Sequence, residues 1–220
     1  MAQTDNQPGT EPDRELKIIS AERLNFFSDA VVAIAITLLA LDLKVPVADS
    51  NAALWREFRQ DATDYVAFLI SFAVIGSHWQ LHHRVFSHLG RLGGALTRWN
   101  LLWLLMVVLT PFATRVIVGD RAFAGRLTIY AGVQALAAIF FLLAVHEMDR
   151  HGLAREGTPR SLFTRSYYRL TAFAVAFLVS IPLAYLTRWA YLCWLAIPFT
   201  SRIRRLVAAR WPRFGGGDRL

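Results

Sequence analysis

Two aspartates bracket a short apolar run near the start of the chain, an arrangement suited to the passage of an ion. Asp29 precedes and Asp42 follows the run 30–41, which is interrupted only by the hydroxyl of Thr37. Twelve helical residues rise about 18 Å, less than the roughly 30 Å of hydrocarbon in a bilayer. A spanning helix here would hold at least one acid at the hydrocarbon edge, where acids usually face a bundle interior or a water-filled path. The alternative is that both carboxylates lie among the lipid headgroups.

Apolar side chains within this run form one helical stripe. Ile34, Leu38 and Leu41 fall at positions i, i+4 and i+7, and Thr37 borders the same face. If several copies surrounded a symmetry axis, each position would become a ring. Isoleucine and leucine rings would form hydrophobic constrictions, and a threonine ring would offer oxygens to a partly dehydrated cation. The alternative is ordinary helix packing, with Thr37 bonded to its own i−4 carbonyl.

The residues around Asp29 also resemble a known family. Arg23, followed after three residues by Phe27-Ser28-Asp29, is similar to the R-x3-F-S-D signature of the transmembrane protein 175 family of potassium channels, and the likeness continues into residues 76–112. The resemblance implies an all-α membrane subunit with six transmembrane helices, the first of which lines the central pore of a homotetramer. It also implies potassium selectivity without a TVGYG filter. The pore-lining residues would then be Ile34, Thr37, Leu38 and Leu41, with the narrow apolar ring at Ile34.

The polar residues of the signature permit two interpretations. Ser28 or Asp29 could cap the N-terminus of a helix. In the family, the corresponding residues lie inside a continuous helix and bond neighbouring helices. Arg23 and Asp29 are six residues apart, so they point to different faces and we expect each to bond another helix. We assign a structural and gating-support role to the signature and to the polar groups of the next two apolar segments: Arg23, Phe27, Ser28, Asp29, His78, Trp79, His82 and Asn100.

Two other classes of protein compete with the channel interpretation. His78, His82 and His83 resemble a histidine box of a membrane di-iron enzyme, but the remaining three histidines form no second box. The sequence has no serine elbow, P-loop or Rossmann glycine pattern either. We therefore expect no enzyme, no metal and no cofactor, with K⁺ as the permeant ion. An ion-coupled transporter stays open as an alternative, although a single Phe-Ser-Asp copy favours a unit that needs symmetry partners.

The composition indicates a membrane protein. Of 220 residues, 55% are hydrophobic and 18% charged, and the formal net charge is +8. A basic protein can bind nucleic acid, but here the positive charges lie between apolar segments and at the C-terminus. They therefore indicate membrane topology and contact with anionic lipid rather than a nucleic-acid partner. The single cysteine, Cys193, excludes a disulfide within the chain.

Hydropathy divides the chain into six expected spans, with no alternating strand pattern: residues 26–43, 65–81, 99–114, 127–145, 170–187 and 189–201. Seventeen of the 24 Lys and Arg residues fall on the side that carries both termini. The positive-inside rule then places both termini in the cytoplasm, with the protein in the inner (plasma) membrane. We expect a disordered cytoplasmic arm at 1–19, a channel domain at 20–207 and a basic tail at 208–220. The tail either lies on anionic lipid or acts as a stop-transfer cluster.

Overall fold

The computed structural model describes residues 11–119 and 121–195, and every regular element in this part of the chain is a helix. An all-α fold is therefore confirmed; the nearest approach to a sheet is an isolated bridge between Leu89 and Ala154. The helices, in order, are α1 (Glu11–Leu41), α2 (Asn51–Gln60), α3 (Ala62–Phe86), α4 (Gly94–Ile117), α5 (Phe123–Arg150), α6 (Arg160–Leu186) and α7 (Leu192–Leu195).

Four of these helices are long and apolar enough to cross a membrane: Ile18–Leu41 of α1, and all of α4, α5 and α6. They contain four of the six expected spans, except that the first ends at Leu41 rather than at residue 43 and the fifth at Leu186 rather than at residue 187. The expected second span lies in α3, which has 25 residues but is not among the four. Its C-terminal half is polar, with Ser77, His78, Gln80, His82, His83 and Arg84. Of the expected sixth span, the described part contains only the four-residue α7, and residues 196–201 lie outside the described residues.

The first helix begins earlier than the sequence indicated. α1 starts at Glu11, so residues 11–19, which we assigned to a disordered arm, are helical. The helix then continues without a break through Ser28 and Asp29 to Leu41. Ser28 and Asp29 are therefore not N-terminal caps, and the capping alternative is wrong.

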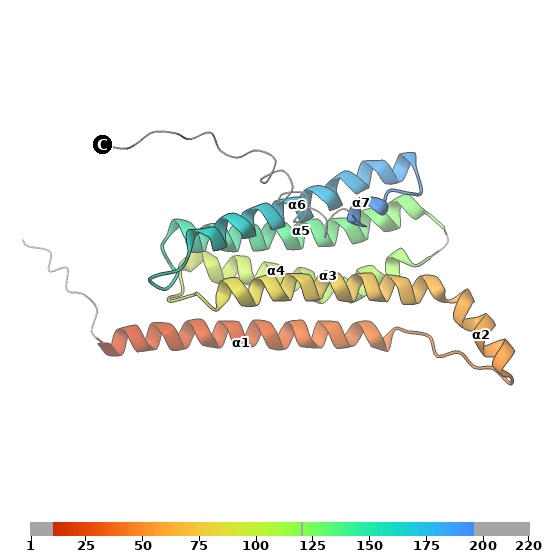
Figure 1. Ribbon diagram of the computed structural model, residues 1–220, viewed down its shortest axis with the longest axis horizontal. Helices are drawn as coiled ribbons and strands as arrows, with labels where there is room; N and C mark the ends of the chain where they lie inside the picture. The colour runs from red at the N-terminus through yellow and green to blue at the C-terminus, as the bar shows by residue number, and fades with distance from the viewer. Residues whose placement is uncertain (1–10, 120, 196–220) are drawn as a thin grey trace, which may run out of the picture.

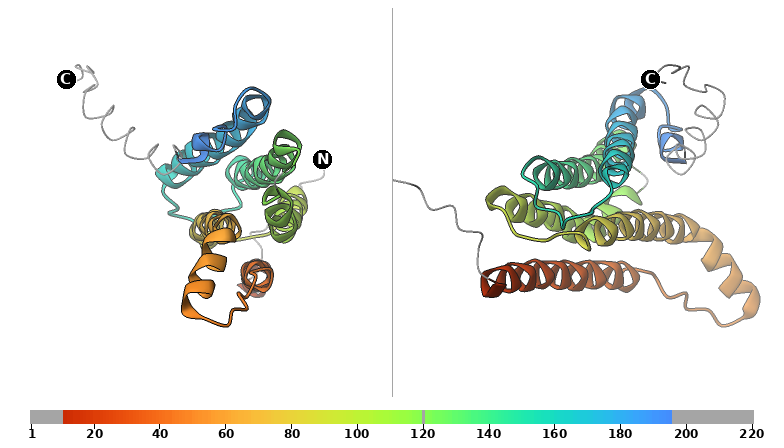
Figure 2. Two further views of the ribbon diagram at one scale, coloured as in Figure 1. Left: turned by 90° about the vertical axis from the view of Figure 1, so that its right-hand side faces the viewer. Right: turned by 60° about the vertical axis from the view of Figure 1, so that its left-hand side comes forward.

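The subunit consists of a bundle of α3, α4, α5 and α6 with α1 packed along one edge. α1 lies at one edge and packs on α3 and α4, while α5 lies between α4 and α6 (Figures 1 and 2). Among the described helices, α1 has no packing contact with α5 or α6. Buried side chains form two clusters, one uniting α1, α3, α4, α5 and the first part of α6, and the other uniting α4, α5 and α6. One long face of α1 consequently lacks a neighbour among the described helices of the subunit.

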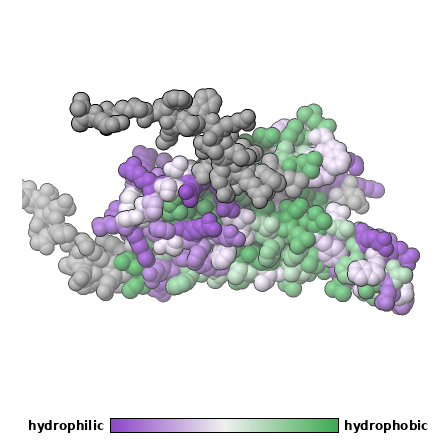
Figure 3. Space-filling model, viewed as in Figure 1, coloured by the Kyte–Doolittle hydropathy of each residue, from purple (hydrophilic) through white to green (hydrophobic). Residues whose placement is uncertain are grey.

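The two ends of the bundle are tied by different contacts. At one end, Asp42 pairs with Arg115 of α4 at 3.0 Å, and the connection to α3 contains α2, which the sequence analysis did not anticipate. At the other end, the loops α3–α4 and α5–α6 meet, since the Gly90 amide donates to the Leu153 carbonyl at 2.9 Å and the Arg155 amide to the His88 carbonyl at 2.8 Å. Figure 3 shows hydrophilic side chains gathered at this looped end and hydrophobic ones over the middle of the bundle.

Candidate functional site

The two faces of α1 differ sharply in burial. Ala21, Ser28, Val32, Ala35 and Leu39 are at most 2% exposed, and their spacings of seven, four, three and four residues place them on one helical stripe. This stripe packs against α3 and α4. The opposite stripe is uncovered. Its apolar side chains are 60% exposed at Ile34, 40% at Leu38 and 79% at Leu41.

The expected pore residues all lie on or beside this uncovered stripe. The Thr37 hydroxyl donates to the Ile34 carbonyl at 2.8 Å, so its proton is committed to a backbone bond within the helix, at i−3 rather than i−4. A hydroxyl oxygen keeps acceptor capacity after donating its proton. Thr37 is exposed, so this remaining capacity is available to a group outside the subunit.

A buried hydrogen-bond chain joins Ser28 of α1 to α4 and α3. The Ser28 hydroxyl donates to its own Leu24 carbonyl at 2.8 Å and accepts from the Asn100 amide nitrogen at 2.9 Å. The Asn100 amide oxygen lies 2.9 Å from Nε2 of His82. Because that oxygen can only accept, Nε2 of His82 carries the proton. Three helices are thereby joined through groups that are all fully buried.

Asp29 makes a second connection to α3. Its carboxylate accepts a hydrogen bond from the indole nitrogen of Trp79 at 2.9 Å, and its other oxygen lies 3.8 Å from Nδ1 of His83. Its side chain is 28% exposed. Ser28 and Asp29 of the signature thus contact different helices, and the contacts lie within the segments in which we expected their partners.

The remaining residues with expected roles lie elsewhere. His78 accepts a hydrogen bond from the indole nitrogen of Trp103 on α4 at 3.4 Å, and its ring meets that of Phe173 on α6. Arg23 and Phe27 are exposed. Arg23 has no ion pair or hydrogen bond among the described residues, where we expected a partner on another helix. Its place on the face of α1 away from α3 and α4 explains the difference, because Arg23 and Ile34 are eleven residues apart and share that face.

Trp103 also belongs to the cluster around His82, although in the sequence it is only one of several large side chains within an apolar span. Trp103 is only 1% exposed; its ring stacks on His82 at 4.3 Å between centroids, and Phe86 stacks on His82 at 3.9 Å. Its place three residues after Asn100, on the same helical face, is the signal that could have indicated it.

The histidines do not form a metal centre in the described part of the chain. No three His, Cys, Asp or Glu side chains there are grouped so that they could hold a metal ion. His82 is committed to Asn100, and His83 faces Asp29, so the three histidines of the box do not converge.

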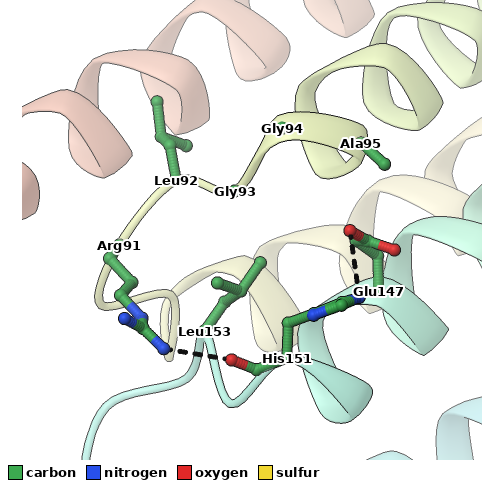
Figure 4. Close-up of a pocket in the computed structure, with 8 residues that line it drawn as sticks. All are labelled: Arg91, Leu92, Gly93, Gly94, Ala95, Glu147, His151 and Leu153. Carbon is green, nitrogen blue, oxygen red and sulfur yellow. Dashed lines mark hydrogen bonds and ion pairs between the residues drawn. The ribbon is translucent and has the colours of Figure 1, made fainter.

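A cavity of about 410 Å³ lies apart from these residues, at the looped end of the bundle. It is lined by Arg91, Leu92, Gly93, Gly94, Ala95, Glu147, His151 and Leu153 (Figure 4). Arg91 donates to the His151 carbonyl at 3.1 Å, and His151 lies 3.5 Å from Glu147. None of the residues expected in the pore or in its support lines this cavity.

Charged groups fix the end of α1 near α2. Besides the pair of Asp42 with Arg115, Lys44 lies 3.0 Å from Asp61 and 3.1 Å from Asp64. Hydrogen bonds to Asp61 and then to Asp64 raise the pKa of Lys44 above its usual value, so it stays charged. At the other end of the helix, Glu22 lies 3.2 Å from Arg155 of the α5–α6 loop.

Known proteins are similar to the part of the chain that contains these residues of α1, α3 and α4. The family model described as endosomal/lysosomal potassium channel TMEM175 matches residues 23–111, which contain the Arg23 signature, α3 and most of α4. A potassium channel of Streptomyces collinus is 40% identical over 134 residues, covering 59% of this chain and 65% of that protein. A potassium channel of Chamaesiphon minutus is 34% identical over 178 residues, covering 71% of this chain and 84% of that protein.

A solved structure resembles the fold as well. The crystal structure of a lysosomal potassium-selective channel TMEM175 homolog from Chamaesiphon minutus superposes with a TM-score of 0.66 at 28% sequence identity. The superposition covers 87% of this chain and 99% of that one. The similarity therefore extends over most of the bundle.

Proposed function

Because the chain belongs to the TMEM175 family of ion channels, we propose that it is a potassium channel whose α1 helices line the conduction path. The family consists of channels rather than enzymes, and K⁺ is the permeant ion rather than a bound cofactor. The proposed activity is passive, potassium-selective conduction across the membrane. Oxygens other than those of a TVGYG filter would serve the ion, since that motif is absent from the sequence.

The observation that carries this proposal is the uncovered apolar stripe of α1. Ile34, Leu38 and Leu41 are exposed in a helix whose other face is tightly packed. A single α1 cannot enclose a path, but copies of it around a symmetry axis can, and homo-oligomers close in this way. We propose four subunits, the number that the family resemblance implies. The stripe would then face the axis, with Ile34 as the main hydrophobic constriction.

The other residues have supporting roles in this proposal. Exposed Thr37, one turn beyond Ile34, would present its free acceptor capacity to a partly dehydrated K⁺. The buried hydrogen-bond chain from Ser28 to His82 would fix the rotation of α1 about its own axis. The bond between Asp29 and Trp79 would fix the position of α1 along that axis relative to α3. Exposed Arg23 would lie on the same face at the entrance to the path, where a neighbouring subunit is within reach.

We propose the following membrane arrangement. α3 and the segment 189–201 would complete six spans, with both termini cytoplasmic and the looped end of the bundle inside the cell. α3 can span despite its polar half because His78 and His82 face protein rather than lipid. The channel domain would extend to residue 207 and be followed by the basic tail 208–220, which would contact anionic lipid; the arm would shorten to the residues before Glu11. The inner (plasma) membrane is the proposed location.

The proposal is tested with purified protein in liposomes that carry a potassium gradient and a voltage-sensitive dye. A passive potassium channel should drive the membrane potential to the potassium equilibrium value, and it should do so less well when sodium replaces potassium. No proton or sodium counter-gradient should be needed. Potassium movement that requires such a counter-gradient would instead indicate an ion-coupled transporter.

A further inference from the structure

One arginine is half-buried between α6 and α3 and has no acidic partner among the described residues. Arg169 of α6 is half-buried, and its Nη2 donates to the backbone carbonyl of Ser77 on α3 at 3.3 Å. Among the described residues no carboxylate forms an ion pair with it, whereas Arg115 and Arg155 each pair with an acid. An unpaired charge within a membrane-spanning helix is costly, so such a residue commonly marks a binding site.

A second arginine, Arg84, lies on the face of α3 that Arg169 contacts. Arg84 of α3 is exposed, and the Arg169 guanidinium reaches α3 two turns before it, at the Ser77 carbonyl. Arg84 is seven residues after Ser77 and therefore lies on the same face of α3. Arg165, one turn before Arg169 on α6, is also exposed. Two helices thus bring cations together with no carboxylate paired to Arg84, Arg165 or Arg169 in the described part of the chain.

The exposed side chains change from charged to apolar with distance from the looped end of the bundle. α3 ends and α6 begins at the looped end of the bundle, and a contact between the rings of His78 and Phe173 aligns the antiparallel pair. The cations lie toward that end. Further along α3, exposed side chains on the face of Ser77 and Arg84 are apolar, at 53% for Val66 and 60% for Leu69. Cations at one end of this surface and apolar side chains beyond them match an amphiphile with a negatively charged head group and apolar chains.

We propose that the surface formed by Arg84, Arg165 and Arg169 binds the phosphate of an anionic phospholipid. The guanidinium groups suit phosphate oxygens, because each presents several donors in a fixed geometry. The acyl chains would lie along the apolar part of α3 that contains Val66 and Leu69. The adjoining apolar surface favours a lipid over a free phosphate ion, which would use only the charged end. The site is formed by α3 and α6, does not include the uncovered stripe of α1, and goes beyond the conduction path proposed above.

The binding is tested by native mass spectrometry of the detergent-purified full chain with phosphatidylglycerol or phosphatidylcholine added. We expect phosphatidylglycerol to be retained preferentially. Arg169→Gln and Arg84→Gln should each weaken that binding about fivefold, the effect of removing one charge near an anionic lipid. The matched control is Arg160→Gln, since Arg160 is exposed on α6 but nine residues from Arg169 and hence on the opposite side of the helix.

Each outcome bears on the proposal. Unchanged binding in Arg169→Gln and Arg84→Gln, or equal weakening in Arg160→Gln, would overturn it. Displacement of the lipid by glycerol phosphate at equal concentration would show that the site takes a soluble phosphate, which also contradicts the lipid assignment. If Arg169→Gln fails to fold, exposed Arg84 carries the test alone. Because the readout is bound mass, the result does not depend on whether the chain conducts potassium.

Discussion

Asn100 of α4 donates a hydrogen bond to the hydroxyl of Ser28 on α1 across 2.9 Å, in a part of the subunit with almost no exposure to solvent. This bond fixes which face of α1 points inward. Ile34 is six residues after Ser28, well round the helix from it, so the same bond keeps the Ile34 stripe turned away from α3 and α4. The position of the candidate pore face therefore depends on a polar contact at the opposite face.

Removing this contact should destabilise the subunit. Ser28→Ala leaves the amide of Asn100 without its acceptor, and Asn100→Ala leaves Nε2 of His82 unsatisfied. Each change should cost about 1–3 kcal/mol. The double variant should cost less than the sum, because the two residues share one bond. The measurement is the thermal stability of the purified protein, with Thr164→Ala as control, since that exposed hydroxyl bonds only its own helix. If the stability losses of the two single variants add up to the loss of the double variant, Ser28 and Asn100 are not energetically coupled and the account of this bond is wrong.

The proposed topology predicts the location of fused reporters. Fusions after Ala48 and after Gly119 should be extracytoplasmic, whereas those after Gly90, Gly157 and the C-terminus should be cytoplasmic, because seventeen of the 24 basic residues lie on the latter side. The bond from Gly90 to Leu153 and the pair of Asp42 with Arg115 place the two groups of loops at opposite ends of the bundle. A cytoplasmic signal at Gly119 would overturn the six-span arrangement.

Thr37→Val tests the proposed oxygen ring. The substitution keeps the shape of the side chain but removes the hydroxyl, including its bond to the Ile34 carbonyl. If Thr37 faces a conduction path, the preference for potassium over sodium should fall several-fold in liposome flux, while the oligomer stays intact on size-exclusion chromatography. Thr128→Val is the control, since that hydroxyl bonds the Ala124 carbonyl of α5, away from α1. Unchanged selectivity in a conducting Thr37→Val channel would return Thr37 to a role in helix packing.

Cysteine cross-linking tests whether copies of α1 face one another. In a Cys193→Ser background, Leu41→Cys places a single thiol at a position that is 79% exposed on the uncovered stripe. A short bifunctional maleimide should then produce dimers on denaturing gels. Val32→Cys is the matched control, because Val32 is only 2% exposed on the packed face. Dimers from Val32→Cys with none from Leu41→Cys would place the wrong face of α1 at the subunit contact.

The sequence was sufficient for the helical class and for the faces of α1, because both follow from local periodicity. It could also name the segments that contain the partners of Ser28 and Asp29. It could not say that Ser28 bonds Asn100 while Asp29 bonds Trp79, since those pairings depend on how three helices cross. α2 was missed because an amphipathic ten-residue helix without buried residues leaves no hydropathy signal. Arg169 was counted only as a loop charge, although it lies within α6.

The central claim is that Ile34 forms a hydrophobic constriction on the axis of a potassium channel. An ion crossing a ring of isoleucines loses hydration with nothing to replace it, so Ile34→Asn should lower the barrier by letting water stay. A fall of about 1.4 kcal/mol would raise potassium flux about tenfold. The matched control is Ile36→Asn, the same change two residues away at a side chain packed against the core.

The deciding measurement is potassium flux into liposomes, divided by the amount of intact oligomer recovered by size-exclusion chromatography. The account predicts a rise in normalised flux for Ile34→Asn and none for Ile36→Asn. Normalised flux that does not rise in an intact Ile34→Asn oligomer, or that rises equally in both variants, would contradict the claim.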